Sequence, residues 1–370
     1  MDRFVITYRI QATGRAEAMT RAEGIALEQT LEIPRDVVPK GYVEDELLGK
    51  VEDLGALSNT QWQAAISYSP DCAGAEITQF LNVVFGNSSI QQGIRVTGID
   101  PGATLAARLP GPRFGIDGIR RMCGRASGGL IAPVLKPMGL PPAYFAELAA
   151  GCVRGGADII KEDHGLAGQP TAPFRARVAA TAAAVAQENA RTGRRALYFP
   201  NLSGDATEIE ANLRFAKDAG AGGILVMPGL FGFGLVHRIA QDAGLDLPVM
   251  THPSFLGPYM LAPDNGLDHG VLLGTVQRLA GSDISVFPNM GGRFGFTAAQ
   301  CHQIADACRT PDGPGRPILP SPGGGMSVAR ARDMQDMYGQ DVVYLLGGSL
   351  LKDPAQIDMA VADMRKALDA

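Results

Sequence analysis

The stretch Ala157-Asp158-Ile159-Ile160-Lys161-Glu162-Asp163-His164 decides the fold, because a short apolar run leads directly into a group of charged side chains. Short apolar runs bounded by glycine or polar residues are typical of buried β-strands. The same unit recurs through residues 129–349, and each copy ends in a polar or glycine-bearing tip. The predicted strands are Leu130–Leu135, Asp158–Lys161, Ala196–Phe199, Gly223–Met227, Pro248–Thr251, Ile284–Phe287, Pro317–Leu319 and Val342–Leu346.

Amphipathic helical stretches alternate with these eight strands, which predicts a closed parallel (β/α)8 barrel. An open, doubly wound sheet is the structural alternative, but such a sheet has a switch in strand order rather than similar tips on every strand. We therefore expect an α/β fold with a TIM barrel over residues 129–370. Its predicted helices are Tyr144–Arg154, Arg177–Thr192, Ile209–Ala219, Val271–Ala280, Ala298–Cys308 and Val328–Tyr338, followed by a covering helix at Asp353–Leu368.

Residues 1–105 lack this rhythm and mix strands with helices. The predicted strands are Phe4–Ile10, Gln61–Tyr68 and Ile94–Ile99, and the predicted helices are Ala16–Gln29 and Ile77–Phe85. This mixture predicts an N-terminal α+β domain of the ferredoxin-like type. Residues 106–128 contain several prolines and glycines, and they predict a connection between the two domains.

The composition excludes several classes of protein. A chain of 370 residues, 46% hydrophobic and 19% charged, is long enough for two globular domains with a sizeable core. A net charge of −5 gives no basic surface for nucleic acid, and no apolar run is long enough to span a bilayer. The five cysteines are odd in number and lack CxxC spacing, which predicts reduced thiols in a cytoplasmic protein.

Charged side chains stand at the ends of the first two barrel strands. Lys136 follows an apolar strand, so it either acts as an acid or base with a lowered pKa or extends to solvent. In the second strand Lys161 and Asp163 point to one face and Glu162 to the other. Oxygen ligands suit Mg²⁺, and lysine supplies them only after CO₂ has converted its amine into a carbamate. A solvated charge cluster is the alternative.

Three later tips carry further polar side chains. Asn201 follows the third strand, and His252 follows the fifth, where it is a candidate proton carrier. Arg293 lies in a glycine-rich loop after the sixth strand. This arginine either clamps a phosphate or carboxylate of the substrate or remains exposed in a mobile loop.

Two glycine runs end the last two strands, Gly323-Gly324-Gly325 and Gly347-Gly348. Glycine lets backbone N–H groups approach phosphate oxygens, and a following helix N-terminus adds its dipole. In (β/α)8 barrels the loops after strands 7 and 8 frequently hold a phosphate. The two runs therefore predict a phosphate site, and with the charged tips they indicate an enzyme acting on a small phosphorylated substrate.

Taken together, these tips resemble those of the large subunit of RuBisCO and, more closely, those of the form IV RuBisCO-like proteins of the short isomerase type. The resemblance covers nearly the whole chain and rests on Lys136-Pro137 and on the run from Gly155 to Asp163. It implies that Lys161 is carbamylated and binds Mg²⁺ together with Asp163. It also implies that Asn201, His252 and the glycines Gly325, Gly347 and Gly348 contact the substrate or its phosphate.

Two residues of the N-domain, Glu28 and Asn87, match family residues that reach the active site of the neighbouring subunit. This match implies a homodimer or a larger homo-oligomer. We expect neither nucleic acid nor a membrane as a partner.

The chain departs from the carboxylases of this family at four positions. His164 replaces a second acidic metal ligand, Met138 replaces a lysine, Arg293 replaces the flexible-loop lysine, and Gly323 replaces a serine. His164 would ligate the metal through nitrogen, hydrogen-bond to the carbamate, or mark a weakened site. The resemblance therefore implies a protein that does not fix CO₂ but retains a base, a metal site and a phosphate site for forming an enediolate.

Four functions are compatible with such a site. The first is an isomerase of methionine salvage that converts 5-methylthioribulose 1-phosphate into 1-methylthioxylulose 5-phosphate. In this reaction Lys136 or the carbamate of Lys161 removes a carbon-bound proton, and His252 relays it. The second is a lyase that decarboxylates a 3-oxo sugar-acid phosphate such as 3-oxo-isoapionate 4-phosphate, with Arg293 holding the carboxylate.

The third function is a 2,3-diketo-5-methylthiopentyl-1-phosphate enolase, whose base in the family is an N-domain lysine near the position of Asn87. The fourth is a non-catalytic binding protein. The retained Lys136, Lys161 and Asp163 argue against a non-catalytic role. The isomerase is the function that the sequence favours.

Overall fold

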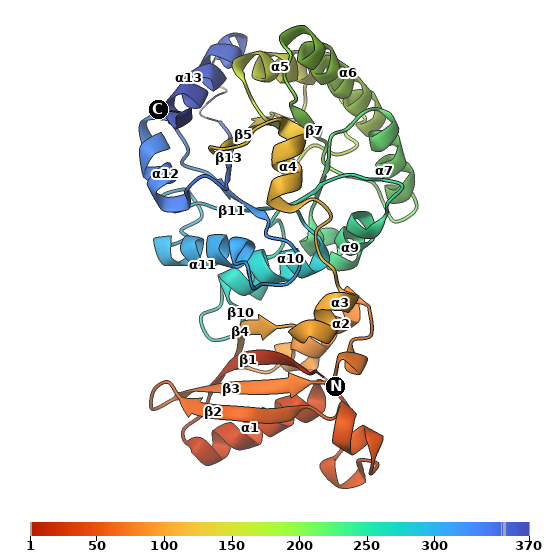
Figure 1. Cartoon of the computed structure of the whole chain (residues 1–370), viewed down its shortest axis with the longest axis vertical. Coiled ribbons are helices and arrows are strands. Elements are labelled where there is room, and N and C mark those ends of the chain that lie inside the picture. The colour runs from red at the N-terminus through yellow and green to blue at the C-terminus, as the bar shows by residue number, and fades with distance from the viewer. Residues whose placement is uncertain (1, 349, 351–352, 370) are drawn as a thin grey trace.

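The computed structural model describes residues 2–348, 350 and 353–369. These residues form two parts that follow one another along the long axis of the molecule (Figure 1). The smaller part contains a five-stranded sheet, and the larger part contains an eight-stranded parallel sheet surrounded by helices. Among the described residues, no helix combines the length and the apolar character needed to cross a lipid bilayer.

The N-terminal sheet has the strand order β10-β4-β1-β3-β2, in which β10 (Gly266–Leu267) comes from the chain between two barrel strands. Alternate side chains of β1 (Phe4–Gln11) are buried, so one face of this sheet contributes to the core. The other strands of the domain are β2 (Lys50–Ala56), β3 (Gln61–Tyr68) and β4 (Ile94–Asp100), and its helices are α1 (Arg15–Glu28), α2 (Ile77–Phe85) and α3 (Gly102–Arg108). Sequence analysis missed β2, because this edge strand buries only Leu54 and carries charged residues elsewhere.

The barrel strands run in the order β7-β6-β5-β13-β12-β11-β9-β8, and all paired neighbours are parallel. A bridge between Asn201 and Leu225 joins the two ends and closes the barrel. The strands are β5 (Leu130–Leu135), β6 (Ile159–Glu162), β7 (Leu197–Phe199), β8 (Ile224–Val226), β9 (Val249–Thr251), β11 (Ile284–Pro288), β12 (Leu319–Gly323) and β13 (Val343–Leu346). The predicted (β/α)8 barrel is thus confirmed.

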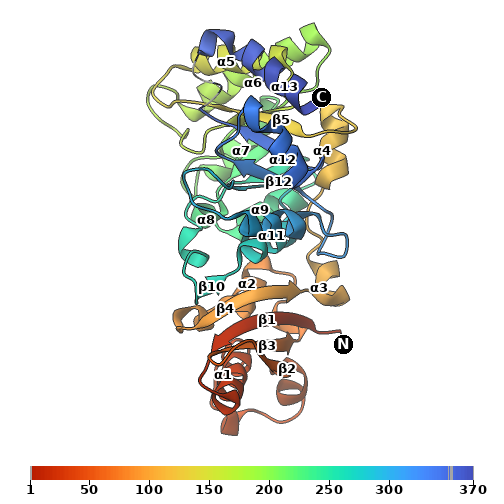
Figure 2. The ribbon, with the colours of Figure 1, turned by 90° about the vertical axis from the view of Figure 1, so that its left-hand side faces the viewer.

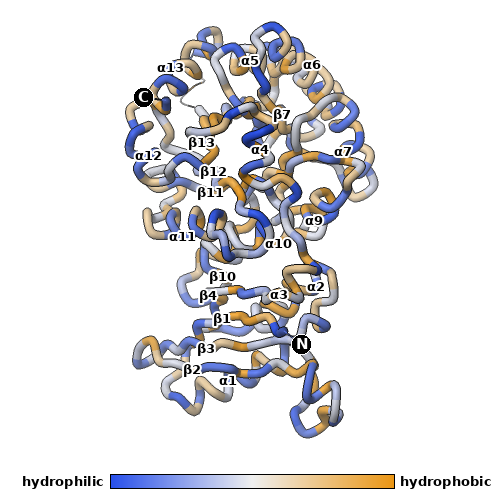
Figure 3. Tube along the Cα trace, in the orientation of Figure 1, coloured by the Kyte–Doolittle hydropathy of each residue, from blue (hydrophilic) through white to orange (hydrophobic). Residues whose placement is uncertain are grey.

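Helices cover the outside of the barrel, and hydrophobic and hydrophilic residues alternate along them (Figure 3). They are α5 (Pro142–Gly155), α6 (Phe174–Thr192), α7 (Ile209–Asp218), α8 (Pro228–Phe231), α9 (Phe233–Gln241), α10 (Val276–Ala280), α11 (Ala298–Arg309), α12 (Ala331–Tyr338) and α13 (Ile357–Asp369). The short helices α8 and α9 between β8 and β9 were not predicted from the sequence.

Helix α4 (Gly115–Cys123) forms within the stretch that the sequence predicts as a connection. Ile119 and Cys123 of this helix pack into the same cluster as the inward-facing residues of the barrel strands. Figure 2 shows α4 on one side of the barrel and α8, which follows the carboxyl end of β8, on the other. Helix α4 therefore closes the amino-terminal end of the barrel and leaves the carboxyl-terminal end for the site.

Strand β12 lies later in the chain than the predicted Pro317–Leu319, which is a correction to the sequence analysis. Pro320 and Pro322 occupy alternate positions of this strand, and proline has no N–H group. Both missing donors therefore belong to the same edge of the strand, the one towards β13. The intervening residues face β11, where Leu319 N–H donates to Asp283 O over 3.0 Å. The side towards β13 is paired only at Gly323, opposite Leu345. Prolines are tolerated in this strand because one of its sides is nearly unpaired.

Candidate active site

The carboxyl ends of β5 and β6 bring Lys136, Lys161 and Asp163 together. Lys161 pairs in register with Val134 of β5 and Phe199 of β7. Lys136 Nζ lies 2.8 Å from Asp163 Oδ2. As the strand period predicts, Lys161 and Asp163 face one side and Glu162 faces the other.

Lys161 is only 1% exposed, and its ammonium donates to Glu162 O over 2.8 Å. Burial lowers the pKa of Lys161 to about 8, and the neighbouring Lys136 cation lowers it too, against the opposing effects of Asp163 and Glu162. A depressed pKa means that part of the amine is neutral near neutral pH, and the neutral amine is the form that reacts with CO₂.

Asp163 is the acceptor at the centre of the site. Burial alone would raise the pKa of its carboxyl group, but the ion pair with Lys136 and a hydrogen bond from Gly165 N–H hold the pKa below its ordinary value. Asp163 is therefore ionised at neutral pH. Its Oδ1 atom also lies 3.7 Å from His164 Nδ1.

His164 and His252 stack on one another, with ring centroids 4.0 Å apart and an interplanar angle of 17°. Burial lowers the pKa of both imidazoles, and the Lys161 and Lys136 cations lower it further. His252 Nδ1 accepts from Ser254 N–H over 3.3 Å, so the neutral ring carries its proton on Nε2. The sequence placed both histidines at strand tips but did not anticipate their stacking.

On the opposite face of β6 from Lys161, Glu162 forms a fully buried ion pair with Arg177, whose Nε lies 2.7 Å from Glu162 Oε1. The Tyr198 hydroxyl and Asn201 N–H also donate to the Glu162 carboxylate, over 2.6 and 3.0 Å. Sequence analysis missed this network. The only signal for it was a carboxylate on the opposite face of β6 and an arginine in the first turn of the following helix.

Asn201 holds the loop that carries His164. Its Nδ2 atom donates to His164 O over 3.2 Å and to Leu166 O over 2.8 Å. Its Oδ1 atom is buried and has no hydrogen-bond partner in the part of the chain that the structure describes. Sequence analysis predicted contact between Asn201 and the substrate, and in the structure Asn201 is fully buried and supports the His164 loop.

The side chains at these tips suit a divalent cation once Lys161 is carbamylated. Among residues 2–348, 350 and 353–369, no three or more His, Cys, Asp or Glu side chains are grouped to hold a metal. A carbamate on Lys161 would add two oxygens beside Asp163, and His164 would contribute a nitrogen. The depressed pKa of Lys161 and the ionised Asp163 are the two observations that fit this predicted set.

The pKa of Lys161 makes a prediction for carbamylation. A pKa of about 8 leaves roughly a tenth of the amine neutral at pH 7 and roughly nine tenths at pH 9, whereas an ordinary lysine stays protonated. At constant dissolved ¹³CO₂ we expect the ¹³C carbamate signal to rise through this interval and to be absent in K161M. A wild-type protein that shows no carbamate signal at pH 8.5 would contradict the assignment.

The two glycine runs lie at the ends of adjacent strands, β12 and β13. Gly323 is the last residue of β12 rather than part of the loop, whereas Gly324 and Gly325 have positive φ angles of 97° and 66°. A Cβ atom added at Gly347 or Gly348 would meet nothing within 4 Å. The β13 tip thus has open space beside both of its glycines, whereas an added Cβ at Gly325 would lie 2.7 Å from Arg330 Nη1.

Arg293 lies in the loop between β11 and α11, and its guanidinium stands 4.9 Å from the centre of the Phe294 ring. Its charge is the smallest of the contributions that lower the pKa of His164. A Cβ atom added at Gly292 would lie 3.6 Å from Gly324 C, so this loop adjoins the predicted phosphate site.

Glu28 and Asn87 lie together in the N-domain. Asn87 Nδ2 donates to Glu28 Oε1 over 3.0 Å and to Glu32 Oε1 over 2.6 Å. Among the described residues, no hydrogen bond or ion pair joins Glu28 or Asn87 to the barrel tips. Glu32 is an additional carboxylate that sequence analysis did not single out.

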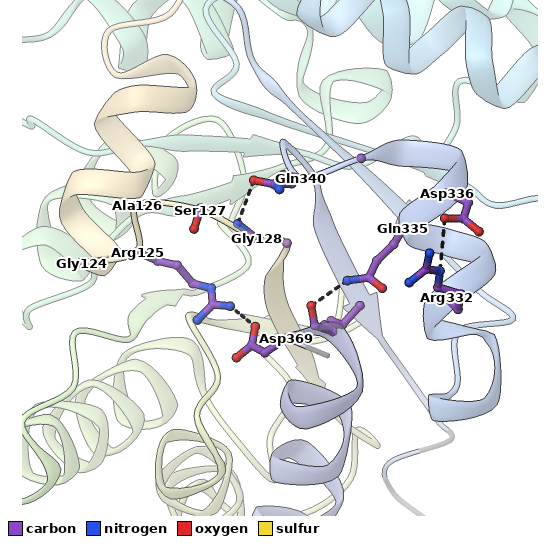
Figure 4. A pocket seen from close by; sticks show the side chains of 13 residues that line it. Gly124, Arg125, Ala126, Ser127, Gly128, Arg332, Gln335, Asp336, Gln340 and Asp369 are labelled. Carbon is purple, nitrogen blue, oxygen red and sulfur yellow. Dashed lines mark hydrogen bonds and ion pairs between the residues drawn. The ribbon is translucent and has the colours of Figure 1, made fainter.

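Two surface hollows lie at the opposite end of the barrel. The larger, of about 780 Å³, is bounded by the loop after α4, by α12 and by the end of α13, and Figure 4 shows Arg125 pointing to Asp369 across it. The smaller, of about 480 Å³, includes Arg365, which pairs with Asp158 at the start of β6. Active sites of (β/α)8 barrels lie at the carboxyl ends of the strands, so the site is assigned by its chemistry rather than by these hollows.

Residues 115–299 match the family model described as the ribulose bisphosphate carboxylase large chain, catalytic domain. The chain is 37% identical over 356 residues to the ribulose bisphosphate carboxylase-like protein 1 of Rhodopseudomonas palustris, which covers 96% of this chain and 95% of that protein. It is also 37% identical over 352 residues to the 5-methylthioribulose-1-phosphate isomerase of Rhodospirillum rubrum, which covers 95% of this chain and 92% of the relative.

Another group of relatives has a different activity in its name. The 2,3-diketo-5-methylthiopentyl-1-phosphate enolase of Bacillus pumilus is 30% identical over 355 residues, which cover 95% of this chain and 87% of the enolase. Among solved structures, the Rubisco-like protein from Rhodopseudomonas palustris superposes with a TM-score of 0.88 at 35% identity, covering 100% of this chain and 98% of that one.

Proposed function

The chain belongs to the RuBisCO large-chain family, and we propose that it is a RuBisCO-like isomerase of methionine salvage acting on 5-methylthioribulose 1-phosphate. The observation that carries the proposal is the buried Lys161 beside the Lys136–Asp163 pair, on the same barrel end as two glycine-lined tips. A relative with this activity in its name, 37% identical over almost the whole chain, supports the choice of substrate.

In the proposed reaction the carbonyl moves along the carbon chain by proton transfer, and no atom is gained or lost. Mg²⁺, held by carbamylated Lys161, Asp163 and His164, would polarise the carbonyl and stabilise the enediolate oxygens. The carbamate of Lys161 takes the carbon-bound proton, or Lys136 takes it after giving up its own proton; the Lys136 ammonium lies 2.8 Å from Asp163 Oδ2. Neutral His252 relays the proton through its ring nitrogens.

The remaining side chains bind and orient the substrate. The tips of β12 and β13 receive the single phosphate through backbone N–H groups, and Arg293 closes over it from the adjoining loop. Asn201 supports the site from behind, because its Nδ2 atom holds the loop that carries His164. Glu28 and Asn87 enter the site from a neighbouring subunit, which makes a homodimer the smallest active unit.

The enolase is the second candidate, because relatives with that name share 30% identity with most of this chain. Its family base is a lysine near the position of Asn87. In this chain the Asn87 amide is bound instead to two carboxylates, Glu28 and Glu32, and none of these groups is the amine base of the enolase branch. This contact favours the isomerase.

The proposal predicts the outcome of a phosphorus NMR experiment. Purified protein with Mg²⁺ and bicarbonate should convert the phosphate resonance of 5-methylthioribulose 1-phosphate into that of 1-methylthioxylulose 5-phosphate, without release of inorganic phosphate or CO₂. Parallel samples contain the diketo phosphate substrate of the enolase and a 3-oxo sugar-acid phosphate. An unchanged ketose phosphate would overturn the proposal, and turnover of either parallel substrate would identify the alternative.

A further inference from the structure

The chain between β9 and the helical turn Val271–Thr275 leaves the barrel and joins the sheet of the N-domain. Residues 253–268 of this connection form what we call the anchor segment. Its strand β10 (Gly266–Leu267) pairs in parallel with β4, with Gly266 opposite Arg95 and Leu267 opposite Val96. The segment begins directly after His252, so the site and the N-domain are linked within one subunit.

Arg95 holds the anchor segment in the N-domain. The guanidinium forms an ion pair with Asp268. It also donates to four carbonyl oxygens, those of Met260, Ala262, Asn265 and Leu267, over 2.6 to 3.1 Å. Arg9 adds a further bond to Pro263 O over 2.8 Å. The anchor segment is thus folded around a single side chain.

Arg95 is only 4% exposed, so its N–H groups cannot exchange these bonds for bonds to water. A buried guanidinium must have its donors satisfied, and its planar fork fixes the direction of each acceptor. Lysine would offer one compact cation without that fork. The shape of the anchor segment therefore depends on arginine in particular at this position.

The near end of the anchor segment is hydrogen-bonded to His252. The turn Pro253–Leu256 carries Ser254, which bonds to His252 Nδ1 through both its hydroxyl and its N–H. Leu256 N–H donates to Pro253 O over 3.0 Å, and the Leu256 side chain is buried in the core. A shift of the segment would therefore turn the His252 imidazole relative to His164.

The far end of the anchor segment leads to the loop that carries Arg293. His269, the residue after Asp268, meets the Phe296 ring edge to face, with centroids 4.8 Å apart. Phe296 is buried and lies three residues after Arg293. The anchor segment thus contacts the His252 tip directly, and the residue that follows it, His269, contacts the base of the Arg293 loop.

We propose that Arg95 is a positioning residue of the active site, which acts from the N-domain through the anchor segment on His252 and on the Arg293 loop. Its effect on turnover rests on the proposed isomerase function. Its effect on the orientation of His252 does not, because that effect follows from the contacts alone.

The test compares R95M with R108M. Arg108 is a matched control, because it also lies in the N-domain and also bonds a carbonyl and a carboxylate, Pro70 O and Asp71 Oδ1 over 2.9 Å each. The chain has five histidines, so ¹³C-labelled histidine gives few ring signals to assign. We expect the signals of His252, His164 and His269 to shift in R95M and to stay unchanged in R108M.

The variant D268N, which keeps the side-chain shape, provides the same test if R95M does not fold. It should shift the same three signals by a smaller amount, and R95K should shift them as R95M does. Histidine signals that remain at the wild-type positions in folded R95M or D268N would overturn the proposal, whatever substrate the enzyme turns over.

With the ketose phosphate as substrate, R95M should lower kcat by roughly 10- to 100-fold, because misplacement of His252 affects the chemical step. It should also raise KM by a smaller factor, because the loop that carries the phosphate-binding Arg293 shifts as well. R108M should retain the wild-type kcat. Equal losses in both variants would indicate a general structural effect and contradict a positioning role.

Discussion

K161M will lose isomerase turnover by about 10³-fold, because the methionine side chain cannot form a carbamate or hold a cation beside Asp163. The substitution suits the site sterically, since Lys161 is buried and methionine is unbranched and apolar. Turnover of the ketose phosphate at saturating Mg²⁺ and bicarbonate measures the effect. K366M is the matched control, because Lys366 is exposed on α13 outside the barrel, and it should retain full activity.

Stability should move in the opposite direction. The folded pKa of Lys161 lies below that of the unfolded chain, so the charged form is disfavoured by folding at all pH values below about 8. This cost, about 3 kcal/mol at neutral pH, fades as the pH rises through the folded pKa towards that of a free lysine. K161M avoids it and should unfold in urea at no lower concentration than the wild type.

The two measurements together separate function from folding. A K161M protein that keeps turnover within about 10-fold of the wild type would rule out a central role for Lys161. Loss of both turnover and stability would show a folding defect instead. Only a stable, inactive variant agrees with a lysine retained for chemistry at a cost in stability.

The barrel was predictable because its signal is local. Each of the runs from Leu130–Leu135 to Val342–Leu346 is apolar and ends in a polar tip, and the closing of the sheet follows from that repetition. The same strand period predicted that Lys161 and Asp163 share a face. Elements with weak local signals were missed or misplaced, as in the polar edge strand β2 and the proline-containing β12.

Contacts between distant residues could not be predicted in this way. Nothing near Gly266–Leu267 indicates that these residues join the N-domain sheet, because their partners Arg95 and Val96 lie 171 positions earlier in the chain. The stacking of His164 on His252 likewise needs two tips to converge across the barrel. The candidate site was predictable as a set of residues, whereas its geometry follows from the three-dimensional closure of the barrel.

E162Q will destabilise the folded protein by about 3–5 kcal/mol, because it leaves the Arg177 charge buried without a counter-charge. Both partners are fully buried, and the carboxylate also accepts from Tyr198 and Asn201. Urea unfolding measures the loss. The control is E210Q, which removes an exposed carboxylate that pairs with Arg214 and Arg238 at 2.8 Å. This substitution should lower the free energy of unfolding by less than about 1 kcal/mol.

The double variant E162L/R177M distinguishes a structural pair from a catalytic one. Replacing both partners with apolar side chains removes the unpaired charge, so most of the stability lost in E162Q should return. Turnover should not return with it, because Glu162 also holds Asn201 N–H, and Asn201 fixes the loop of His164. Recovery of turnover to the wild-type level in the double variant would contradict this link, and a loss below about 1 kcal/mol in E162Q would contradict the buried pair itself.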